Sequence, residues 1–562
     1  MSSHPSAKCM DCGEQAQFNL SAPACTACGS QWFRAEYDYE AIGQALPSVL
    51  PDRLFNLWRY LELLPVGRPD PNVTMGEGGT PLIQASNLGM MLGLNRLFIK
   101  DERQGATASF KDRQAAVNVM ALKEARIAEA VLASTGNVAI AYSAYAVRGG
   151  IKLWAFLTSL VPEEKMREVA LYGTQVVKVT GTYDQAKQLA AEFAHQYGLY
   201  LETGARSIPS VEAMKTIAFE IAEQLTHSLG PPIQVGNARQ VKAPWRSPDW
   251  YIQAVSGGLG PLGVQKGFAE LYQMRLINRA PAIACIQTEG CAPMVRAWQA
   301  GRDVAEIIHS PRTHITTLST GDPGKTYTLL RKSALRDGGT FESVSDEETF
   351  RMIHILAKME GISVEPAAAV AFAGLVKLVR AGIIKPNEIV VVNCSGHTMP
   401  VERTVLGDGW SYDIAATTTR LNEKPVEGLL AALSHLSAGR FPRIAIVDDN
   451  PDARRLIRRI LQARDNFMLF EAANGEEALR LSEQGQLDLI ILDLMMPGVD
   501  GFSVIDALKE NPKTASIPVI VVTAKELTPE ENERLDGQIH NLMQKGEFLS
   551  DDLTQEVESL VK

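Results

Sequence analysis

Lys111 is the residue whose type and position most directly suggest chemistry. It lies in the segment Ser109–Arg113, between a turn rich in Gly, Ala and Thr and a long run with helical periodicity. A lysine amine is a useful nucleophile only when burial or a neighbouring cation lowers its pKa, and a lysine at such a turn can point into a cleft. Taken alone, Lys111 is better explained as an exposed lysine at a helix start. Its interpretation therefore depends on the residues that accompany it.

Two turns of small residues are candidates for such partners. One follows the short apolar run Ala130–Ala133, and the other follows the run Tyr251–Val255. Each pattern is typical of a strand, a turn and a helix start, where free backbone N–H groups and the helix dipole favour an anion. One turn can therefore hold a carboxylate and the other a phosphate. The turn residues are Ser134, Thr135, Gly136 and Asn137 in the first, and Ser256, Gly257, Gly258, Leu259 and Gly260 in the second.

A second chemical signal is a group of four cysteines near the N-terminus. They form two C-x-x-C pairs separated by twelve residues, each followed directly by a glycine that fits a turn. Each pair can form a knuckle that supplies two thiolates, and four thiolates suit a tetrahedral zinc ion. The alternative is a redox pair or free thiols, but one dithiol would need no second copy. We predict a structural Zn²⁺ site at Cys9, Cys12, Cys25 and Cys28, and we expect Cys285, Cys291 and Cys394 to be buried small hydrophobes.

Acidic residues form a third candidate site near the C-terminus. Each follows a short apolar run: Asp448 and Asp449 come after Ile444–Val447, Asp493 after Leu489–Leu492, and the hydroxyl of Thr523 after Val519–Val522. Open parallel sheets place their sites at the carboxyl ends of strands. Three converging carboxylates suit Mg²⁺, a hard cation that prefers oxygen ligands. Lys545, which follows Ile539–Gln544, can reach the same pocket.

The elements that position these residues are typical of an α/β protein. Short apolar runs such as Val176–Val179, Ala282–Ile286 and Glu388–Val392 alternate with longer helical patterns. This alternation predicts parallel sheets with helices on both faces. About 320 residues is too many for one compact sheet, so we expect two lobes with a cleft between them. The predicted domains are a zinc ribbon at 1–36, the two-lobed domain at 37–409, a linker at 410–440 with an amphipathic helix over Val426–Leu436, and a smaller α/β domain at 441–562.

Composition and charge narrow the function classes. The 562 residues are 46% hydrophobic and 21% charged, with a mean hydropathy of -0.05. The N-terminus lacks an apolar signal, and no segment approaches the roughly 20 apolar residues of a membrane span, so we expect a cytoplasmic protein without membrane contact. Residues 441–562 contain 13 Lys and Arg against 23 Asp and Glu, which accounts for the whole net charge of -10. Such a domain repels nucleic acid, and no nucleic-acid partner is expected.

Between about Lys8 and Pro400 the chain resembles the fold-type II pyridoxal phosphate (PLP) enzymes, and most closely the threonine synthases. Seven blocks of that family pattern occur in order along the chain. They are the zinc ribbon followed by Tyr37-Asp38-Tyr39, Gly78-Gly79-Thr80-Pro81-Leu82, the S-F-K-D-R segment, the S-T-G-N turn, Lys215–Ile221, Val364-Glu365-Pro366-Ala367, and Ser395-Gly396-His397.

The resemblance implies a role for each matching residue. Lys111 would form the Schiff base with PLP and later move the proton at the α-carbon of the substrate. Gly257–Gly260 would cradle the cofactor phosphate, while Asn137 would contact the ring hydroxyl. Ser395 would meet the ring nitrogen, which favours elimination and replacement over transamination. Ser134–Asn137 would take the carboxylate of a small amino-acid substrate.

Two stretches depart from the threonine synthase pattern. Threonine synthases usually read N-P-T-G before the S-F-K segment, where this chain has Gly105–Ala108. They also carry an N-P-x-R stretch whose Asn and Arg help to hold the substrate phosphate, where this chain has Ser207–Ser210, with Arg206 near but shifted. A dianion held without a bidentate Arg loses its strongest partner. The substrate stays open between O-phosphohomoserine and the substrates of cysteate synthase-like or serine/threonine dehydratase-like enzymes.

Residues 441–562 resemble the receiver domain of two-component response regulators, most specifically in Asp493–Gly501. The resemblance implies a flavodoxin-like, doubly wound fold that a histidine kinase or a phosphotransfer protein phosphorylates. Asp493 would be the phosphoacceptor, Asp448, Asp449 and Asp493 would bind Mg²⁺, Thr523 would be the switch hydroxyl, and Lys545 would contact the phosphate. The chain departs from the family at Gly546, usually proline, and at Leu542, often aromatic. The alternative is a receiver fold kept only for docking.

Two function classes follow for the whole chain. The first is a PLP-dependent carbon-oxygen lyase, a homodimer, that acts on a hydroxy- or phospho-amino acid. Threonine synthase, which converts O-phosphohomoserine and water to threonine and phosphate, is the first choice, with regulation by phosphorylation of Asp493. The second is a signalling protein whose PLP-type half is a sensor or scaffold. Lys111 and Ser395 argue against the second class, whereas Ser207–Ser210 keep it open.

Overall fold

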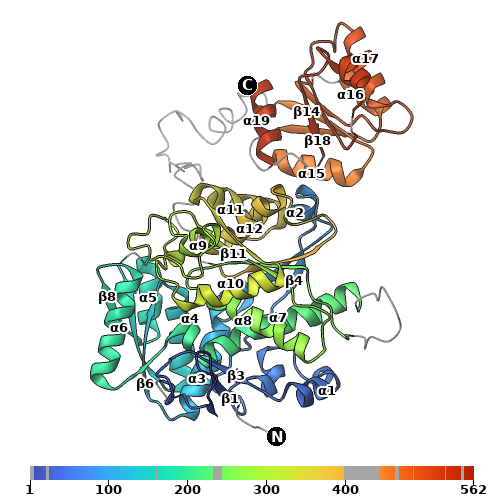
Figure 1. Ribbon diagram of the computed structural model, residues 1–562. Helices are drawn as coiled ribbons and strands as arrows, with labels where there is room; N and C mark the ends of the chain where they lie inside the picture. The colour runs from blue at the N-terminus through green and yellow to red at the C-terminus, as the bar shows by residue number, and fades with distance from the viewer. Residues whose placement is uncertain are drawn as a thin grey trace, which may run out of the picture. The chain divides into compact units, whose positions relative to one another are not determined.

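The structure is a computed structural model, shown as a ribbon in Figure 1. It describes residues 5–20, 24–159, 161–231, 243–397, 442–462, 467–484, 487–525, 527–545 and 550–561. The chain divides into two compact units, one of residues 1–85, 96–353 and 363–399, and one of residues 86–95, 354–362 and 400–562. The predicted linker at 410–440, including the helix expected at Val426–Leu436, lies outside the described residues.

The first unit contains a six-stranded sheet. Its strand order is β12 (Thr340–Val344), β11 (Ala282–Thr288), β10 (Trp250–Ala254), β13 (Ile389–Cys394), β5 (Arg96–Asp101) and β4 (Leu82–Gln84). Neighbouring strands are parallel, except that β4 at the edge is antiparallel to β5. The helices α7 (Ile208–Leu229) and α8 (Leu259–Gln273) share the main hydrophobic core with this sheet.

A second, fully parallel sheet of four strands lies in the same unit. Its order is β8 (Gln175–Val179), β7 (Lys152–Thr158), β6 (Glu129–Ser134) and β9 (Tyr200–Leu201). Alternate residues of β6 face opposite sides, because Ala130 and Leu132 pack with α3 (Lys111–Glu124) and α4 (Asn137–Gly149), whereas Val131 packs with α6 (Tyr183–Tyr197). The prediction of two α/β lobes covered by helices on both faces is therefore confirmed.

The N-terminal residues form a small antiparallel sheet. Its order is β2 (Gln15–Gln17), β1 (Ser6–Cys9) and β3 (Phe33–Glu36). Its buried apolar core consists of Ala7 and Ala35, packed against Ile208 of α7. A ribbon with so few buried residues needs another source of order, which in small domains is usually a metal or disulfides.

The described residues from 442 onward form a parallel sheet with helices on both faces. The strand order is β15 (Met468–Ala472), β14 (Arg443–Val447), β16 (Leu489–Leu492), β17 (Val519–Thr523) and β18 (Asn541–Gln544). One face packs against α15 (Pro451–Gln462) and α19 (Ser550–Leu560), and the other against α16 (Gly475–Gln484) and α17 (Gly501–Glu510). The short helix α18 (Pro529–Leu535) joins β17 to β18. This topology confirms the predicted doubly wound fold.

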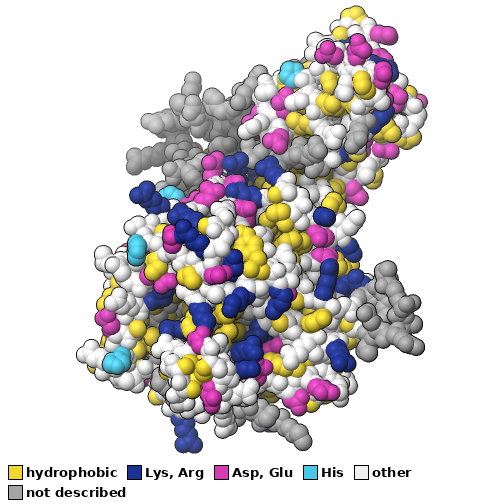
Figure 2. Space-filling view, in the orientation of Figure 1, with side chains coloured by type: hydrophobic (Ala, Val, Ile, Leu, Met, Phe, Trp, Pro, Cys, Tyr) yellow, Lys and Arg dark blue, Asp and Glu magenta, His cyan; other side chains and the backbone are white. Residues whose placement is uncertain are grey.

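The surface is mixed in charge over the face that Figure 2 draws, where Lys and Arg are interspersed with Asp and Glu. Among the described residues, no helix combines the length and the apolar character that crossing a bilayer requires.

Candidate active site

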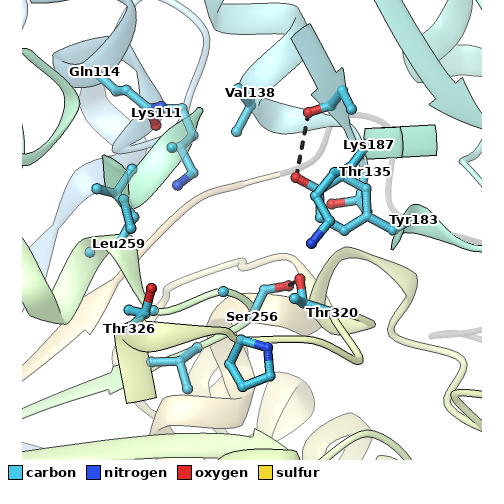
Figure 3. A pocket seen from close by; sticks show the side chains of 18 of the residues that line it. Lys111, Gln114, Thr135, Val138, Tyr183, Lys187, Ser256, Leu259, Thr320 and Thr326 are labelled. Carbon is cyan, nitrogen blue, oxygen red and sulfur yellow. Dashed lines mark hydrogen bonds between the residues drawn. The ribbon is translucent and has the colours of Figure 1, made fainter. Parts of the chain in front are cut away.

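A cavity of about 540 Å³ in the first unit collects most of the residues that the sequence assigned to a PLP site (Figure 3). Residues of both sheets and of the loops that follow their strands line it. Among its walls are Lys111, the turn at Thr135–Asn137, the turn at Ser256–Gly260, and Ser395. The cavity thus lies at carboxyl ends of parallel strands, where α/β proteins bind ligands.

Lys111 is held in this cavity through the backbone of the loop after β13. Ser109 forms an isolated antiparallel bridge with Gly396. The amide of Phe110 donates to the carbonyl of Ser395 at 3.0 Å, and the amide of His397 donates to the carbonyl of Ala108 at 2.9 Å. Since α3 begins at Lys111, the bridge fixes the first turn of this helix beside Ser395, which is 6% exposed.

The electrostatics of the cavity favour the neutral form of the Lys111 amine. Its Nζ lies 4.1 Å from the centre of the Phe110 ring and has no hydrogen-bond or ion-pair partner within the described part of the chain. Burial lowers the pKa of Lys111 to about 8, although the negative charges of Glu202 and Glu365 oppose this effect. The neutral amine, the form that attacks an aldehyde, is therefore much more populated near neutral pH than in an exposed lysine.

The glycine turn before α8 is shaped to receive an anion. Gly258 has φ +87°, and a Cβ at this position would lie 2.8 Å from Thr326 Cγ2. A Cβ at Gly260 would lie 2.4 Å from Gln253 Nε2. Both glycines therefore let the backbone come close to its surroundings, while the first turn of α8 offers free N–H groups and the positive end of the helix dipole. This donor set fits the phosphate of PLP.

The S-T-G-N turn is divided between a lining part and a supporting part. Thr135 and Asn137 line the cavity, and Ser134 and Gly136 are not among its walls. The Ser134 Oγ accepts hydrogen bonds from the amides of Gly136 at 3.0 Å and Ala139 at 3.1 Å, so it holds the start of α4. The Thr135 hydroxyl donates to the Thr317 carbonyl at 3.3 Å.

Asn137 is oriented by two charged residues that the sequence analysis gave no role. Its Nδ2 donates to Glu365 Oε1 at 2.7 Å, and its Oδ1 accepts from Lys165 Nζ at 3.1 Å. Lys165 also pairs with Glu365 at 3.3 Å, and both side chains are buried. The V-E-P-A block was the signal for Glu365, whereas nothing in the pattern around Lys165 on α5 (Glu163–Leu171) pointed to the site.

The stretch that departs from the threonine synthase pattern forms a polar network around a carboxylate. Ser210 Oγ donates to Glu202 Oε1 at 2.6 Å and accepts from Asn118 Nδ2 at 2.8 Å. Ser207 Oγ donates to Asn118 Oδ1 at 3.1 Å. Burial raises the pKa of Glu202, which lines the cavity together with Arg206. Sequence analysis missed Glu202 because it stands in no motif.

The four N-terminal cysteines converge as predicted. Cys9 Sγ lies 3.6 Å from Cys28 Sγ, and Cys12 Sγ lies 3.7 Å from Cys25 Sγ. All four sulfur atoms lie within 4.8 Å of one another. A tetrahedron of four thiolates at a Zn–S distance of about 2.3 Å has sulfur atoms about 3.8 Å apart, so the arrangement fits zinc. Backbone N–H groups of Cys12 and Asp11 lower the pKa of Cys9 to about 6, which favours its thiolate.

In the C-terminal α/β domain the carboxylates of Asp448, Asp449 and Asp493 also converge, with oxygens within 4.8 Å of one another. Lys545 Nζ lies 2.6 Å from Asp448 Oδ2 and 2.5 Å from Asp493 Oδ2. Thr523 at the end of β17 is fully buried. The three carboxylates fit a hard cation such as Mg²⁺. Burial raises the pKa of Asp448, and bound metal would oppose this effect.

Among positions 108, 542 and 546, where the sequence departs from the family patterns, the structure describes the first two, Ala108 and Leu542. Ala108, where the family pattern carries glycine, has φ 53°, in the left-handed region that glycine favours. Leu542, at the position often aromatic in receivers, is 36% exposed on β18. Gly546 lies outside the described residues.

Two family models match this chain. The model described as pyridoxal-phosphate dependent enzyme matches residues 73–396, and the model described as response regulator receiver domain matches residues 444–558. Among curated proteins, a threonine synthase of Methanosarcina acetivorans is 33% identical over 403 residues, which are 71% of this chain and 93% of that protein. A threonine synthase of Methanocaldococcus jannaschii is 33% identical over 69% of this chain and 91% of that protein.

Among solved structures, one similar chain is a threonine deaminase rather than a threonine synthase. The processed form of threonine deaminase isoform 2 from Solanum lycopersicum has a TM-score of 0.46 and 24% sequence identity. The similarity covers 58% of this chain and 81% of that chain.

Proposed function

Because this chain belongs to the pyridoxal-phosphate dependent enzyme family, we propose that it is a lyase in which Lys111 carries PLP and acts on a hydroxy- or phospho-amino acid. The observation that carries this proposal is the position of the Lys111 amine, which shares one cavity with the glycine turn and with Ser395. The 33% identity to threonine synthases over most of their length supports threonine synthesis from O-phosphohomoserine as the first candidate.

The residues of the cavity divide the work of such a reaction. PLP, when bound, supplies the electron sink that makes the α-proton of an amino acid acidic. The Lys111 amine holds the cofactor and, once released, is placed to move this proton. The N–H groups at Gly257–Gly260 bind the phosphate of the cofactor, and Ser395 is proposed to meet its ring nitrogen. Thr135 and Asn137 are proposed to orient the substrate, with Asn137 fixed by Glu365 and Lys165.

Arg206 supports a substrate with an anionic side chain. Its side chain lines the cavity, and its planar guanidinium suits a phosphate. It takes the place of the Asn and Arg of the family pattern, which are Ser207 and Ser210 here. In this proposal Arg206 holds the phosphate that leaves from O-phosphohomoserine.

A serine or threonine dehydratase is the second candidate, and Glu202 favours it. A half-buried carboxylate hydrogen-bonded to Ser210 disfavours a dianion nearby and accepts a hydrogen bond from a hydroxyl group. The first candidate places a phosphate dianion at the side chain of the substrate and the second an uncharged hydroxyl group, so the two can be separated by their substrates.

A substrate panel tests the proposal. Purified protein loaded with PLP is assayed with O-phosphohomoserine, with O-phosphoserine and sulfite, with threonine and with serine, and the released phosphate, ammonia and products are measured. Release of phosphate with formation of threonine supports the first candidate, and release of ammonia from serine or threonine supports the second. A protein that has the visible absorption band of bound PLP but turns over none of these would favour a sensor.

For the receiver domain we propose phosphorylation at Asp493 by a histidine kinase or a phosphotransfer protein, with Mg²⁺ held by the three carboxylates. Lys545, within 2.6 Å of Asp448 and Asp493, would pair with the added phosphoryl group. We further propose that this modification regulates the lyase. Beryllofluoride, a mimic of the phosphoryl group, should change turnover or oligomeric state. The same result with an Asp493→Ala variant, or no change in either property, would contradict regulation.

A further inference from the structure

The zinc ribbon reaches the wall of the cavity. Trp32, which directly precedes β3, lines the cavity that holds Lys111. Two further ribbon residues, Asp11 and Gln31, contact cationic side chains of the same wall. The ribbon is therefore part of the site as well as a structural module.

The first contact joins Asp11 to Lys325 at the start of α10 (Lys325–Asp337). The Lys325 Nζ forms a salt bridge with the Asp11 carboxylate and lies 5.9 Å from the centre of the Trp32 ring. Asp11 is fixed in turn, because Ser30 Oγ donates to its Oδ2 at 2.6 Å. The ribbon thus neutralises Lys325 and directs it along the wall.

The second contact joins Gln31 to Arg206. The Arg206 Nη1 donates to the side-chain oxygen of Gln31. An amide oxygen orients a guanidinium but leaves its positive charge uncompensated. Of the two cations that the ribbon contacts, Arg206 is therefore the one whose charge remains available to an anion in the cavity.

Both contacts depend on the cysteine knuckles. Asp11 lies between Cys9 and Cys12, and Gln31 lies three residues after Cys28. The knuckles close through matching backbone hydrogen bonds, from Gly13 to Cys9 at 3.0 Å and from Gly29 to Cys25 at 2.8 Å. Because the apolar core of the ribbon is small, zinc bound by the four cysteines would supply much of its order and would fix where Asp11 and Gln31 lie.

We propose that the zinc ribbon is a specificity element of the active site, in which Gln31 positions Arg206 to bind the anionic group of the substrate and Asp11 withholds Lys325 from it. This inference rests on the proposed function, in that it assigns the same cavity an anionic substrate. Gln31 and Asp11 are positioning residues that act through Arg206 and Lys325.

The test measures binding of inorganic phosphate by calorimetry to the full-length chain loaded with zinc and PLP. The variant Gln31→Met keeps the size of the side chain and removes the hydrogen bond to Arg206. Gln17→Met, at an exposed position of β2, is the matched control. We expect Gln31→Met to weaken phosphate binding about threefold to tenfold relative to Gln17→Met, the effect of losing one ordinary hydrogen bond. Zinc content and the absorption band of PLP should be equal in both.

Enzyme kinetics and removal of zinc give two further measurements. Neither should change in the expected way if Gln31 had only a structural role in the ribbon. In Gln31→Met, the KM for a phosphorylated substrate should rise by the same factor with kcat nearly unchanged, while the KM for serine or threonine should stay the same. Chelation of zinc from the unmodified chain should weaken phosphate binding at least as much as Gln31→Met does. If chelation precipitates the protein, the two glutamine variants decide the outcome.

The results separate this inference from the proposed function. Equal phosphate affinity of Gln31→Met and Gln17→Met overturns the role of the ribbon and leaves the lyase proposal standing. A chain that binds no phosphate at all overturns the role of Arg206 and with it the ribbon inference. In that case, ammonia release from serine or threonine would still identify the lyase as a dehydratase.

Discussion

The cavity of the first unit and the acidic pocket of the receiver domain each contain a lysine, in opposite electrostatic settings. Lys111 has no hydrogen-bond or ion-pair partner within the described residues, and burial lowers its pKa to about 8. Lys545 lies between Asp448 and Asp493, and although burial lowers its pKa, these two carboxylates raise it above the usual value. Burial alone therefore does not decide the state of a lysine.

The difference teaches how one residue type serves two kinds of chemistry. A buried amine without a counter-ion is held partly neutral and is available to form a covalent bond. An ammonium between carboxylates stays charged and can only pair with an anion, such as a phosphoryl group on Asp493. Loss of the lysine or of the phosphoacceptor at one site is expected to leave ligand attachment at the other intact. Each of the following experiments tests or refines this contrast.

The largest effect is expected for Lys111→Ala. Without the amine, the protein should lose the visible absorption band of PLP and all measurable turnover, because in the proposed function this residue both attaches the cofactor and moves the proton. Phosphorylation of the receiver should be unaffected. The control is Lys332→Ala, at an exposed position of α10. A band that persists in Lys111→Ala would mean that another lysine holds the cofactor.

The reciprocal variant, Asp493→Asn, should accept no phosphoryl group from acetyl phosphate in the presence of Mg²⁺, as measured by mass spectrometry. The amide cannot form the acyl phosphate, and one metal ligand loses its charge. The absorption band of PLP should remain. Asp506→Asn, on the exposed side of α17, should behave like the unmodified chain. Phosphorylation of Asp493→Asn at the same site in the pocket would contradict this assignment.

Lys100 is a further lysine whose role is structural, and it serves as a reference for comparing Lys111 with Lys545. Lys100 Nζ lies 2.7 Å from Glu220 Oε2, and Arg113 Nη1 lies 2.6 Å from Glu220 Oε1, with all three side chains buried. Glu220→Gln leaves two buried cations without this charge and should lower the free energy of unfolding by about 3–5 kcal/mol in urea titrations. Glu347→Gln, which breaks an exposed pair with Arg351, should cost less than about 1 kcal/mol. Similar losses in both variants would be inconsistent with a structural role for the buried network.

The pKa difference itself can be measured by the pH dependence of labelling. In protein freed of PLP, the rate at which Lys111 reacts with an amine reagent should rise with pH and reach half its plateau near pH 8, because only the neutral amine reacts. Lys545 should react appreciably only at higher pH, since its pKa is raised. Peptide mass spectrometry resolves the two sites. A midpoint for Lys111 near that of exposed lysines would show that its amine is not desolvated.

The smallest effect concerns the backbone before Lys111. Ala108 has φ 53°, which strains any residue with a Cβ, so Ala108→Gly should stabilise the protein by about 0.5 kcal/mol after the entropy cost of glycine is subtracted. Ala106→Gly, two residues earlier and not in the left-handed region, should destabilise it by a similar amount. Thermal unfolding curves of the two variants should therefore shift in opposite directions. Equal shifts would mean that Ala108 is not strained.

The sequence predicted which residues meet in the acidic pocket of the receiver domain more completely than it predicted the residues that surround Lys111. Asp448 and Asp493 directly follow two strands of one parallel sheet and Thr523 ends a third, and the carboxyl ends of such strands lie at one edge of the sheet. Only the second strand, β15, carried no signal strong enough to be assigned. In its sequence M-L-F-E-A, buried and exposed positions do not alternate cleanly.

In the cavity, by contrast, the sequence motifs pointed to the residues of the site but not to the residues that hold them in place. Lys165 and Glu202 stand outside every block and reach the site only through folding. Ser134 belongs to a motif, yet its hydroxyl holds the helix start and does not line the cavity. The contact of the ribbon with Arg206 joins segments far apart in the chain, and no periodicity encodes such a pair.

The sequence by itself determined the modules of this protein, because cysteine spacing, apolar runs and turn residues are local patterns that specify a ribbon, strands and helix starts. It also predicted Lys111 as the nucleophile and the three aspartates that converge in the structure, since each stands within or beside a short motif. Only the tertiary structure decided the electrostatic state of each lysine and the neighbours of Arg206. These depend on which side chains long-range backbone pairing brings within a few ångströms, and on how much water that packing removes.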